Sequence, residues 1–402
     1  MSGPLGVLPG MTYDPIRNRY FPTPKDGGKV DLDPKGKKRL RFDAEPVVEA
    51  VHVPIAGPSR RRIVRPSGRR REMNRDGSLG SHFGKLVMKE VCECCPCSGE
   101  NVTSIRSFVG GAFFATTDHG KVVVTTADGE GHAVTVCSAS VLGVHCDVAR
   151  LTMMSISAGP RPHAHVFKRA PEALDHMWIE ATDLALPEGD VYCMSSFDDR
   201  CTVGGSHSLN IVHYASRLAT TYRKLPSDPL CVHQSSSDIA FVGMRSSQIR
   251  LDDLRVKGRR DDTIAQLPGS KAVVGVKRLK DSAVPWGLLA SGMSDQLMIF
   301  DIRFAKQPLR CLKGHVNSFH SDLGLATTPT DSHVLAAGSD DVVRAWSTQT
   351  GEPMSAAEGS SGEDHLLGMT FPSRVRCIQV REDDMGVDVA YGGTFVRFGR
   401  EL

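Results

Sequence analysis

The segments Gly314–His315, Ala336–Asp341 and Arg344–Ser347 decide the fold of this chain. They read Gly-His, then Ala-Ala-Gly-Ser-Asp-Asp, then Arg-Ala-Trp-Ser. This order is typical of a repeat of about 40–45 residues that folds as one four-stranded blade of a β-propeller. One blade cannot bury its own two faces, so a chain with one clear blade is expected to hold several more.

Length and composition bound the remaining possibilities. The 402 residues suffice for one large repeat domain with a tail or for two to three ordinary domains. With 40% hydrophobic and 24% charged residues, the chain has the composition of a soluble globular protein. Its 11 cysteines are scattered apart from one cluster, which favours a reducing compartment over a disulfide framework. Neither a signal peptide nor an apolar run of about 18 residues is found, so we expect an intracellular protein without a membrane span.

Residues 1–78 differ from the rest because they are rich in Pro, Gly and Arg, and they are predicted to form a largely disordered basic arm. Two basic runs in it are typical of nuclear localisation signals, which predicts a nuclear protein with a share in the cytoplasm. Two alternatives stay open: weak, salt-sensitive contact with nucleic acid, or a merely solvated arm. The candidate signal residues are Lys37, Lys38, Arg39, Arg60, Arg61, Arg62, Arg69, Arg70 and Arg71.

Residues 79–99 are interpreted as a linker. Residues 81–92 have apolar side chains at roughly helical spacing, which predicts a short helix, although Gly84 weakens it. The linker also holds a Cys-x-Cys-Cys-x-Cys run. Zinc sites usually separate two ligand pairs by a longer loop, so no metal site is predicted here. The run consists of Cys92, Cys94, Cys95 and Cys97.

Residues 100–402 show one recurring pattern: a short apolar strand ending in a small residue, a polar turn, and a second apolar strand. Short strands at regular spacing with turn signals predict an all-β sandwich, barrel or propeller, and the period of this pattern selects a seven-bladed WD40-type β-propeller. Besides the blade described first, the expected segments are 107–126, 138–168, 178–214, 228–255, 271–303 and 365–400.

The clearest blade carries a set of polar residues that we interpret as structural. A buried Trp and a buried imidazole each need a hydrogen-bond partner, and a carboxylate of the turn, Asp340 or Asp341, is expected to supply one. A metal site at His315 and His320 is not predicted, because no further ligand lies nearby in the sequence. The structural residues of this blade are Gly314, His315, Ser339, Asp341 and Trp346.

Two x-Asp-x-Arg boxes follow the second apolar strand of consecutive repeats, at Asp252–Arg255 and Phe300–Arg303. One interpretation is structural, because any WD blade can carry an Asp in a tight turn at this position together with an Arg that is solvated or pairs with it. Arginines at the same rim position of adjacent blades would nevertheless lie on one face, and Arg is enriched at interface hot spots. We therefore predict a shared partner-binding role for Asp301, Arg303, Asp253, Arg255 and Phe300.

Three segments carry a resemblance to a known family: Leu8–Phe21, Gly243–Arg255, and Gly314–Asn317 with Ala337–Ser347. They resemble the WD-repeat substrate receptors of cullin-4 RING ubiquitin ligases, and most of all the cullin-4-associated factor 4 family. The resemblance implies that the boxes dock on the ligase adaptor, damaged-DNA-binding protein 1. The Trp that usually begins such a box is Asp252 in one blade and Phe300 in the other, so the second box is the better candidate. Such receptors often insert a helix into the adaptor, a part that residues 81–92 could play.

Motifs of nucleotide binding and nucleophilic catalysis are not found in the sequence, which lacks Gly-x-x-x-x-Gly-Lys-Ser/Thr, Gly-x-Ser-x-Gly and His-Glu-x-x-His. We therefore predict a non-catalytic substrate receptor without cofactor, whose partners are the adaptor and an unknown protein substrate. The main alternative is a nuclear WD40 scaffold in chromatin or ribosome assembly, with the basic arm touching nucleic acid.

Overall fold

The computed structural model describes two units of the chain, Met1–Val64 and Arg65–Leu402. In the first unit, β1 (Met11–Asp14) pairs antiparallel with β2 (Arg19–Pro22), so the segment Leu8–Phe21 contributes nearly all of this strand pair. The basic clusters at 37–39, 60–62 and 69–71 lie outside the described residues. These are 11–14, 19–22, 82–83, 85–93, 99–107, 113–125, 131–147, 152–169, 178–213, 218–256, 262–282, 284–355 and 365–400.

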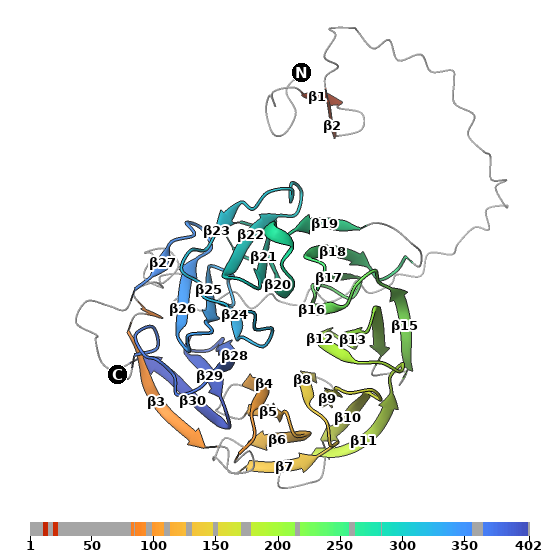
Figure 1. Cartoon of the computed structure of the whole chain (residues 1–402), viewed down its shortest axis with the longest axis vertical. Coiled ribbons are helices and arrows are strands. Elements are labelled where there is room, and N and C mark those ends of the chain that lie inside the picture. Colours follow the sequence, from red (N-terminus) through yellow and green to blue (C-terminus); the bar gives the residue numbers. More distant parts are fainter. Residues whose placement is uncertain are drawn as a thin grey trace, which may run out of the picture. The chain divides into compact units, whose positions relative to one another are not determined.

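The second unit is a ring of seven four-stranded antiparallel sheets, counted over the described residues, which confirms the seven-bladed propeller (Figure 1). Blade one contains β4 (Val102–Ser107), β5 (Phe113–Thr117), β6 (Lys121–Thr125) and β7 (Gly131–Thr135). Blade two contains β8 (Val141–Asp147), β9 (Thr152–Ser157), β10 (His163–Arg169) and β11 (Trp178–Ala185), and blade three contains β12 (Val191–Phe197), β13 (Arg200–Gly205), β14 (Ser208–His213) and β15 (Leu218–Lys224). Blade four contains β16 (Pro229–Gln234), β17 (Ile239–Met244), β18 (Gln248–Asp253) and β19 (Thr263–Gln266). Blades five and six are β20 (Val273–Leu279), β21 (Gly287–Gly292), β22 (Gln296–Asp301) and β23 (Arg310–Cys311); and β24 (Leu325–Thr327), β25 (His333–Ala337), β26 (Val343–Ser347) and β27 (Pro353–Met354).

The seventh blade is closed by a strand from the other end of the propeller sequence. It contains β28 (Val375–Val380), β29 (Val387–Tyr391) and β30 (Thr394–Arg400), and β3 (Leu86–Glu93) pairs antiparallel with β30 as its outer strand. The helix predicted over residues 81–92 is therefore wrong, and part of the predicted linker belongs to the propeller. The physical reason is the unpaired edge of β30, which a β-rich segment can cover.

The core lies between neighbouring blades and depends on a repeated position of the third strand. Phe300, Trp346 and Phe398 occupy this position in blades five, six and seven, and each is fully buried. Side chains of a strand alternate between its two faces, so in these three blades one aromatic residue of the third strand fills the space against a neighbour. Within the part of the chain that the structure describes, no helix is long and apolar enough to cross a membrane.

The innermost strands share one irregularity. A β-bulge follows the first residue of the strand in six of the seven blades, at Val102, Val141, Val191, Pro229, Val273 and Val375. A bulge bends a strand and increases its twist. The repeated bulge therefore gives these inner strands a common curvature where they surround the centre of the ring (Figure 1).

Candidate protein-docking surface

The box of blade five forms a closed two-pronged ion pair. The guanidinium of Arg303 donates from Nε to Oδ1 of Asp301 over 3.0 Å and from Nη2 to Oδ2 over 2.7 Å. The backbone amide of Arg303 also donates to Oδ1, over 3.0 Å. The hydrogen bond from the Arg303 side chain is the main reason that the pKa of Asp301 lies below its usual value. Such paired charge-assisted bonds fix the orientation of the guanidinium plane.

The box of blade four has the same geometry. Arg255 donates from Nε to Oδ1 of Asp253 over 2.9 Å and from Nη2 to Oδ2 over 2.7 Å. Its backbone amide donates to Oδ1 over 3.1 Å. The side chains of Arg255 and Arg303 are 63% and 51% exposed, so both remain accessible to a partner.

Both boxes lie on one face of the propeller. In blade five, Gly287 of β21 pairs with Leu279 at the end of β20 and with Asp301 at the end of β22. The turn between β20 and β21 and the loop after β22 therefore project from the same side of the ring. We call this side, where the first and third strands of each blade end, the box face.

The surroundings of the two boxes differ. The guanidinium carbon of Arg303 lies 5.4 Å from the ring centroid of Trp286 and 5.8 Å from that of Phe304. On the same indole, the guanidinium carbon of Arg278 lies 5.7 Å from the centroid. Cation–π contact of this kind is strongest with Trp. Blade five thus combines a fixed Arg with two exposed aromatic rings, the side-chain types that dominate interface hot spots.

Trp286 and Phe304 are the residues that sequence reasoning missed. Trp286 is 45% exposed and Phe304 is 76% exposed, whereas apolar residues beside a strand are expected to be buried. A signal did exist: Phe304 directly follows the box, and Trp286 follows Pro285 in the turn that precedes a strand. Large apolar side chains placed in turns are candidates for an interface.

Asp252, which departs from the expected box, is part of an ion pair between blades. It is fully buried, and its Oδ1 lies 2.6 Å from Nη1 of Arg223, which comes from β15 of the preceding blade. Arg223 also donates to Asp262 over 2.9 Å. Burial raises the pKa of Asp252, while Arg223 and Arg250 oppose this rise. Phe300, at the equivalent position of blade five, instead packs in an apolar cluster. The first residue of the blade-four box is therefore a buried ion-pair partner, and that of the blade-five box is an apolar core residue.

The hydrogen-bond chain predicted for blade six does not form. Trp346 donates from Nε1 to the carbonyl of Lys313 over 2.8 Å, and Ser339 bonds to Ser318. The ring of His315 stands edge-on to Trp346 with centroids 6.2 Å apart, and burial lowers its pKa to about 4. This part of the prediction is wrong because a backbone carbonyl satisfies the indole.

The backbone conformations of Gly314 and Asp341 explain why these amino acids occur in the turns of blade six. Gly314 has φ +86° and Asp341 has φ +59°, both in the left-handed region that Gly and Asp tolerate. The carboxylate of Asp340 accepts from Nη1 of Arg344 over 2.9 Å, so it is not the partner of His315 or Trp346. All these roles stabilise the turn.

A metal site is not supported by the part of the chain that the structure describes, which holds no group of three or more His, Cys, Asp or Glu side chains able to bind an ion. Of the cysteine run, the backbone of Cys92 lies in β3. Cys94, Cys95 and Cys97 lie outside the described residues.

Comparison with known proteins identifies the fold. No family model matches the chain. The chain matches the crystal structure of the WD40 β-propeller domain of Doa1 with a TM-score of 0.60 at 11% identity, covering 79% of this chain and 97% of that one. It is a WD40-type β-propeller.

Two WD-repeat proteins are similar to parts of this chain. An uncharacterized WD repeat-containing protein of Caenorhabditis elegans is 29% identical over 118 residues, which is 29% of this chain and 21% of that protein. WD repeat-containing protein 21 of Schizosaccharomyces pombe is 23% identical over 166 residues, which is 40% of this chain and 38% of that protein. The matches thus span less than half the length of either relative.

Proposed function

We propose that this WD40 propeller is a non-catalytic substrate receptor of a cullin-4 ubiquitin ligase that docks the ligase adaptor through the box face of blade five. The observation that carries the proposal is the Arg303 guanidinium, which is fixed by Asp301 and exposed between Trp286 and Phe304. WD40 propellers are typically protein-interaction scaffolds, and the x-Asp-x-Arg boxes resemble those with which cullin-4 receptors dock.

The arrangement suits tight docking for a physical reason. Ordering a flexible side chain at an interface costs roughly 0.5–1.5 kcal/mol, and a guanidinium already held by two hydrogen bonds avoids much of that cost. Exposed aromatic rings beside it supply apolar area that a partner can cover. In a ligase, the bound receptor would hold a substrate lysine near the conjugating enzyme and so raise its effective concentration.

Blade five is favoured over blade four. The structure describes no aromatic contact for the guanidinium of Arg255, and the buried carboxylate of Asp252 stands where Phe300 contributes to an apolar interior. Arg255 therefore serves as a matched control, because it shares the bonding geometry of Arg303 without the aromatic neighbours.

The test is retrieval of the adaptor and cullin-4 from cell extract by the full chain, compared among wild type, Arg303→Ala and Arg255→Ala. Loss of one hot-spot side chain is expected to reduce retrieval by Arg303→Ala about tenfold or more, with Arg255→Ala close to wild type. Failure of the wild type to retrieve the adaptor, or equal retrieval by both variants, would contradict the proposal. Thermal unfolding of each variant separates lost docking from lost folding.

The second candidate is a nuclear scaffold in chromatin or ribosome assembly. The basic runs of residues 1–78 favour it, because clustered Lys and Arg bind nucleic acid through phosphate neutralisation. Retrieval of RNA by wild type, and its loss when Arg60–Arg62 and Arg69–Arg71 are reversed in charge, would support this alternative.

A further inference from the structure

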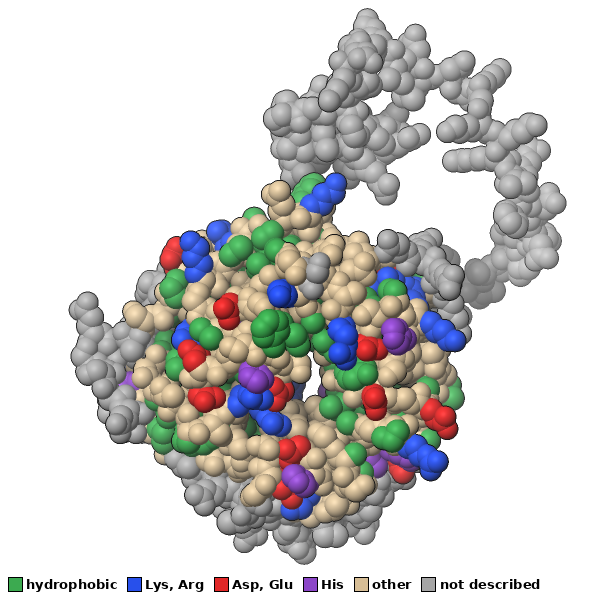
Figure 2. All heavy atoms as spheres, viewed as in Figure 1, with side chains coloured by type: hydrophobic (Ala, Val, Ile, Leu, Met, Phe, Trp, Pro, Cys, Tyr) green, Lys and Arg blue, Asp and Glu red, His purple; other side chains and the backbone are tan. Residues whose placement is uncertain are grey.

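A cavity of about 680 Å³ lies where the first strands of four blades end near the centre of the ring. Its walls come from β4, β20, β24, β28 and the turns that follow them, so it opens on the box face. These strands surround the centre in Figure 1, and the space-filling view shows the ring open there (Figure 2). A volume of this size lies within the range of protein ligand pockets.

Two cationic side chains line this cavity without partners. Lys277 lies on β20 and Arg106 on β4, and neither makes a hydrogen bond or ion pair with any other residue that the structure describes. Burial lowers the pKa of Lys277; Asp331 opposes this shift and Arg106 adds to it. Two like charges that face the same cavity repel each other, and an anion bound in the cavity would relieve that repulsion.

The third cation of the wall, Arg381, and the buried carboxylate of Asp331 already have partners. Asp331 accepts from Oγ1 of Thr327 over 2.7 Å and from the backbone amide of Lys280 over 2.8 Å. Arg381 donates to Asp384 and Asp388. Lys277 and Arg106 are therefore the cations of the wall that remain available to a ligand.

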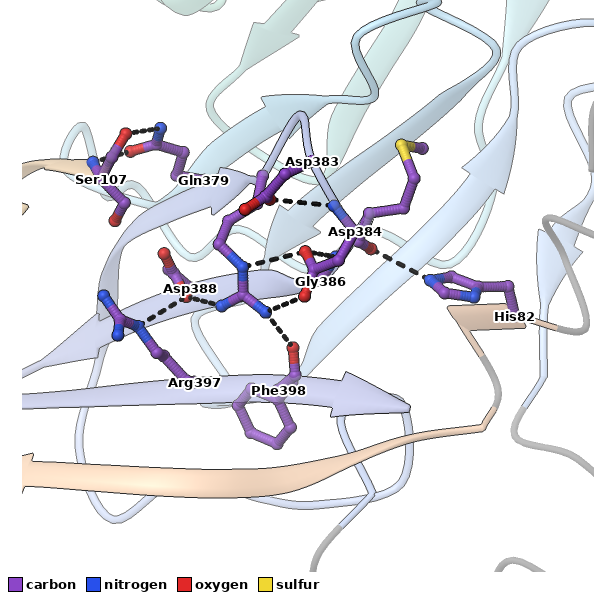
Figure 3. Close-up of polar contacts among 11 residues, drawn as sticks. His82, Ser107, Gln379, Asp383, Asp384, Gly386, Asp388, Arg397 and Phe398 are labelled. Atoms are coloured by element: carbon purple, nitrogen blue, oxygen red, sulfur yellow. Dashed lines mark hydrogen bonds and ion pairs between the residues drawn. The ribbon is translucent and has the colours of Figure 1, made fainter. Parts of the chain in front are cut away.

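The wall is also rigid at the seam between blades seven and one. Gln379 accepts from the amide of Ser107 over 2.8 Å and donates to its carbonyl over 3.2 Å. Figure 3 shows this pair beside the network of Asp384 and Asp388. Hydrogen bonds that join the two blades fix the distance across which a ligand must fit.

The turn after β28 limits which anions can enter. Glu382 and Asp383 line the cavity as carboxylates, and Asp383 accepts only a short local bond from the amide of Asp384 among the described contacts. Their negative charge opposes a polyanion such as nucleic acid, whose phosphates repeat along the strand. A short polypeptide segment with an isolated acidic side chain carries no such repeat and can pass between them.

We infer that this cavity binds an acidic side chain of a partner polypeptide between Lys277 and Arg106. The carboxylate accepts from Nζ of Lys277 and from the guanidinium of Arg106, and the flanking residues of the segment fill the remaining volume. The inference does not depend on the identity of the protein that docks at the blade-five box, because the cavity and the box share a face but no residue.

Pyridoxal 5′-phosphate is a suitable probe, because its phosphate seeks the cations and its aldehyde forms an imine with a neutral amine. Imine formation at Nζ of Lys277 releases water, and borohydride then reduces the imine to a stable amine that peptide mapping locates. We expect Lys277 to be labelled about tenfold faster than Lys313, an exposed lysine on the opposite face of the ring. Pyridoxal without phosphate is expected to lose this preference.

Arg106→Gln and peptide competition complete the test on the full chain. The variant is expected to slow labelling of Lys277 about tenfold, the effect of one charge-assisted hydrogen bond, and to leave Lys313 unchanged. The peptide acetyl-Ser-Ser-Glu-Ser-amide, with one acidic side chain, should protect Lys277, whereas acetyl-Ser-Ser-Gln-Ser-amide should not. Equal labelling of Lys277 and Lys313, an unchanged rate in Arg106→Gln, or equal protection by both peptides would overturn the inference.

Discussion

The guanidinium of Arg303 lies over the indole of Trp286, 5.4 Å from the ring centroid, while its Nε and Nη2 are both bonded to Asp301. The same group is thus held along one edge by a carboxylate and across one face by an aromatic ring. Arg255 has the carboxylate bond in the same geometry. The contrast between the two boxes is the basis of the docking predictions.

Phe304→Ser is expected to weaken docking without affecting stability. The ring is 76% exposed, so its removal leaves the core intact, whereas a partner that covers it would lose a large apolar contact. We expect adaptor binding by purified protein to fall about tenfold, with the thermal midpoint unchanged. Phe319→Ser is a matched control, since this ring is 63% exposed on a different loop. Equal weakening by both substitutions would count against a site at blade five.

Asp252→Ala is expected to destabilise the propeller. The substitution leaves Arg223 buried without its closest carboxylate, and breaking a buried ion pair typically costs about 3–5 kcal/mol in free energy of unfolding. Urea unfolding followed by fluorescence measures the loss. Asp253→Ala, at the neighbouring position of the exposed box pair, should lower the free energy of unfolding much less. A loss no larger than that of the control would show that Asp252 does not stabilise the blade interface.

Stability is expected to fall as the pH drops from about 6.5 towards 4. Burial lowers the pKa of His315 to about 4, from 6.5 in the unfolded chain, so the unfolded state binds more protons in this window. The stabilising contribution is present above pH 6.5 and is lost as the pH falls towards the folded value. His315 alone accounts for about 2 kcal/mol between pH 7 and pH 5.

His315→Phe isolates this contribution. The variant should lose less free energy of unfolding than wild type when the pH is lowered from 7 to 5. His233 and His333 also have their pKa values lowered to about 4 by burial, so part of the pH dependence remains in the variant. An identical loss in wild type and variant would show that His315 does not titrate as its burial requires.

Removal of residues 1–93 is expected to open the ring. This truncation deletes β3, the outer strand of blade seven, and exposes the edge of β30. It also removes Phe83 and Leu86, which are fully buried in the core of that blade. We expect the protein to aggregate or to unfold without cooperativity, because an unpaired edge is a template for other strands. Removal of residues 1–78 keeps β3 and serves as the control, with unfolding like that of the full chain.

Much of the architecture could be predicted from the sequence because each blade repeats a local pattern. Gly314–His315 and Trp346 identified one blade, and the box arginines at 255 and 303 followed from equivalent places in two others. The limits of blades two and three were less accurate. Trp178–Ala185 is the outer strand of blade two, whereas the pattern had placed it in the third segment. Outer strands contact few buried neighbours, so their sequences are weakly constrained.

Features that depend on distant parts of the chain could not be predicted. The strand β3 looked helical because its apolar residues fit both periods, and only β30 decides between them. The sequence alone does not explain why Asp252 replaces the usual Trp, because its ion-pair partner Arg223 belongs to another blade. Likewise, Lys277 and Arg106 approach each other only when the ring is closed.

The pairing of β3 with β30 also has a consequence for how the protein is made. β3 is the first strand of the propeller to leave the ribosome and β30 is the last. The ring can therefore close only after β30 has been synthesised, however early the individual blades fold. A chain that ends prematurely, even by a few residues of β30, is left with two unpaired strand edges at opposite ends of an open arc.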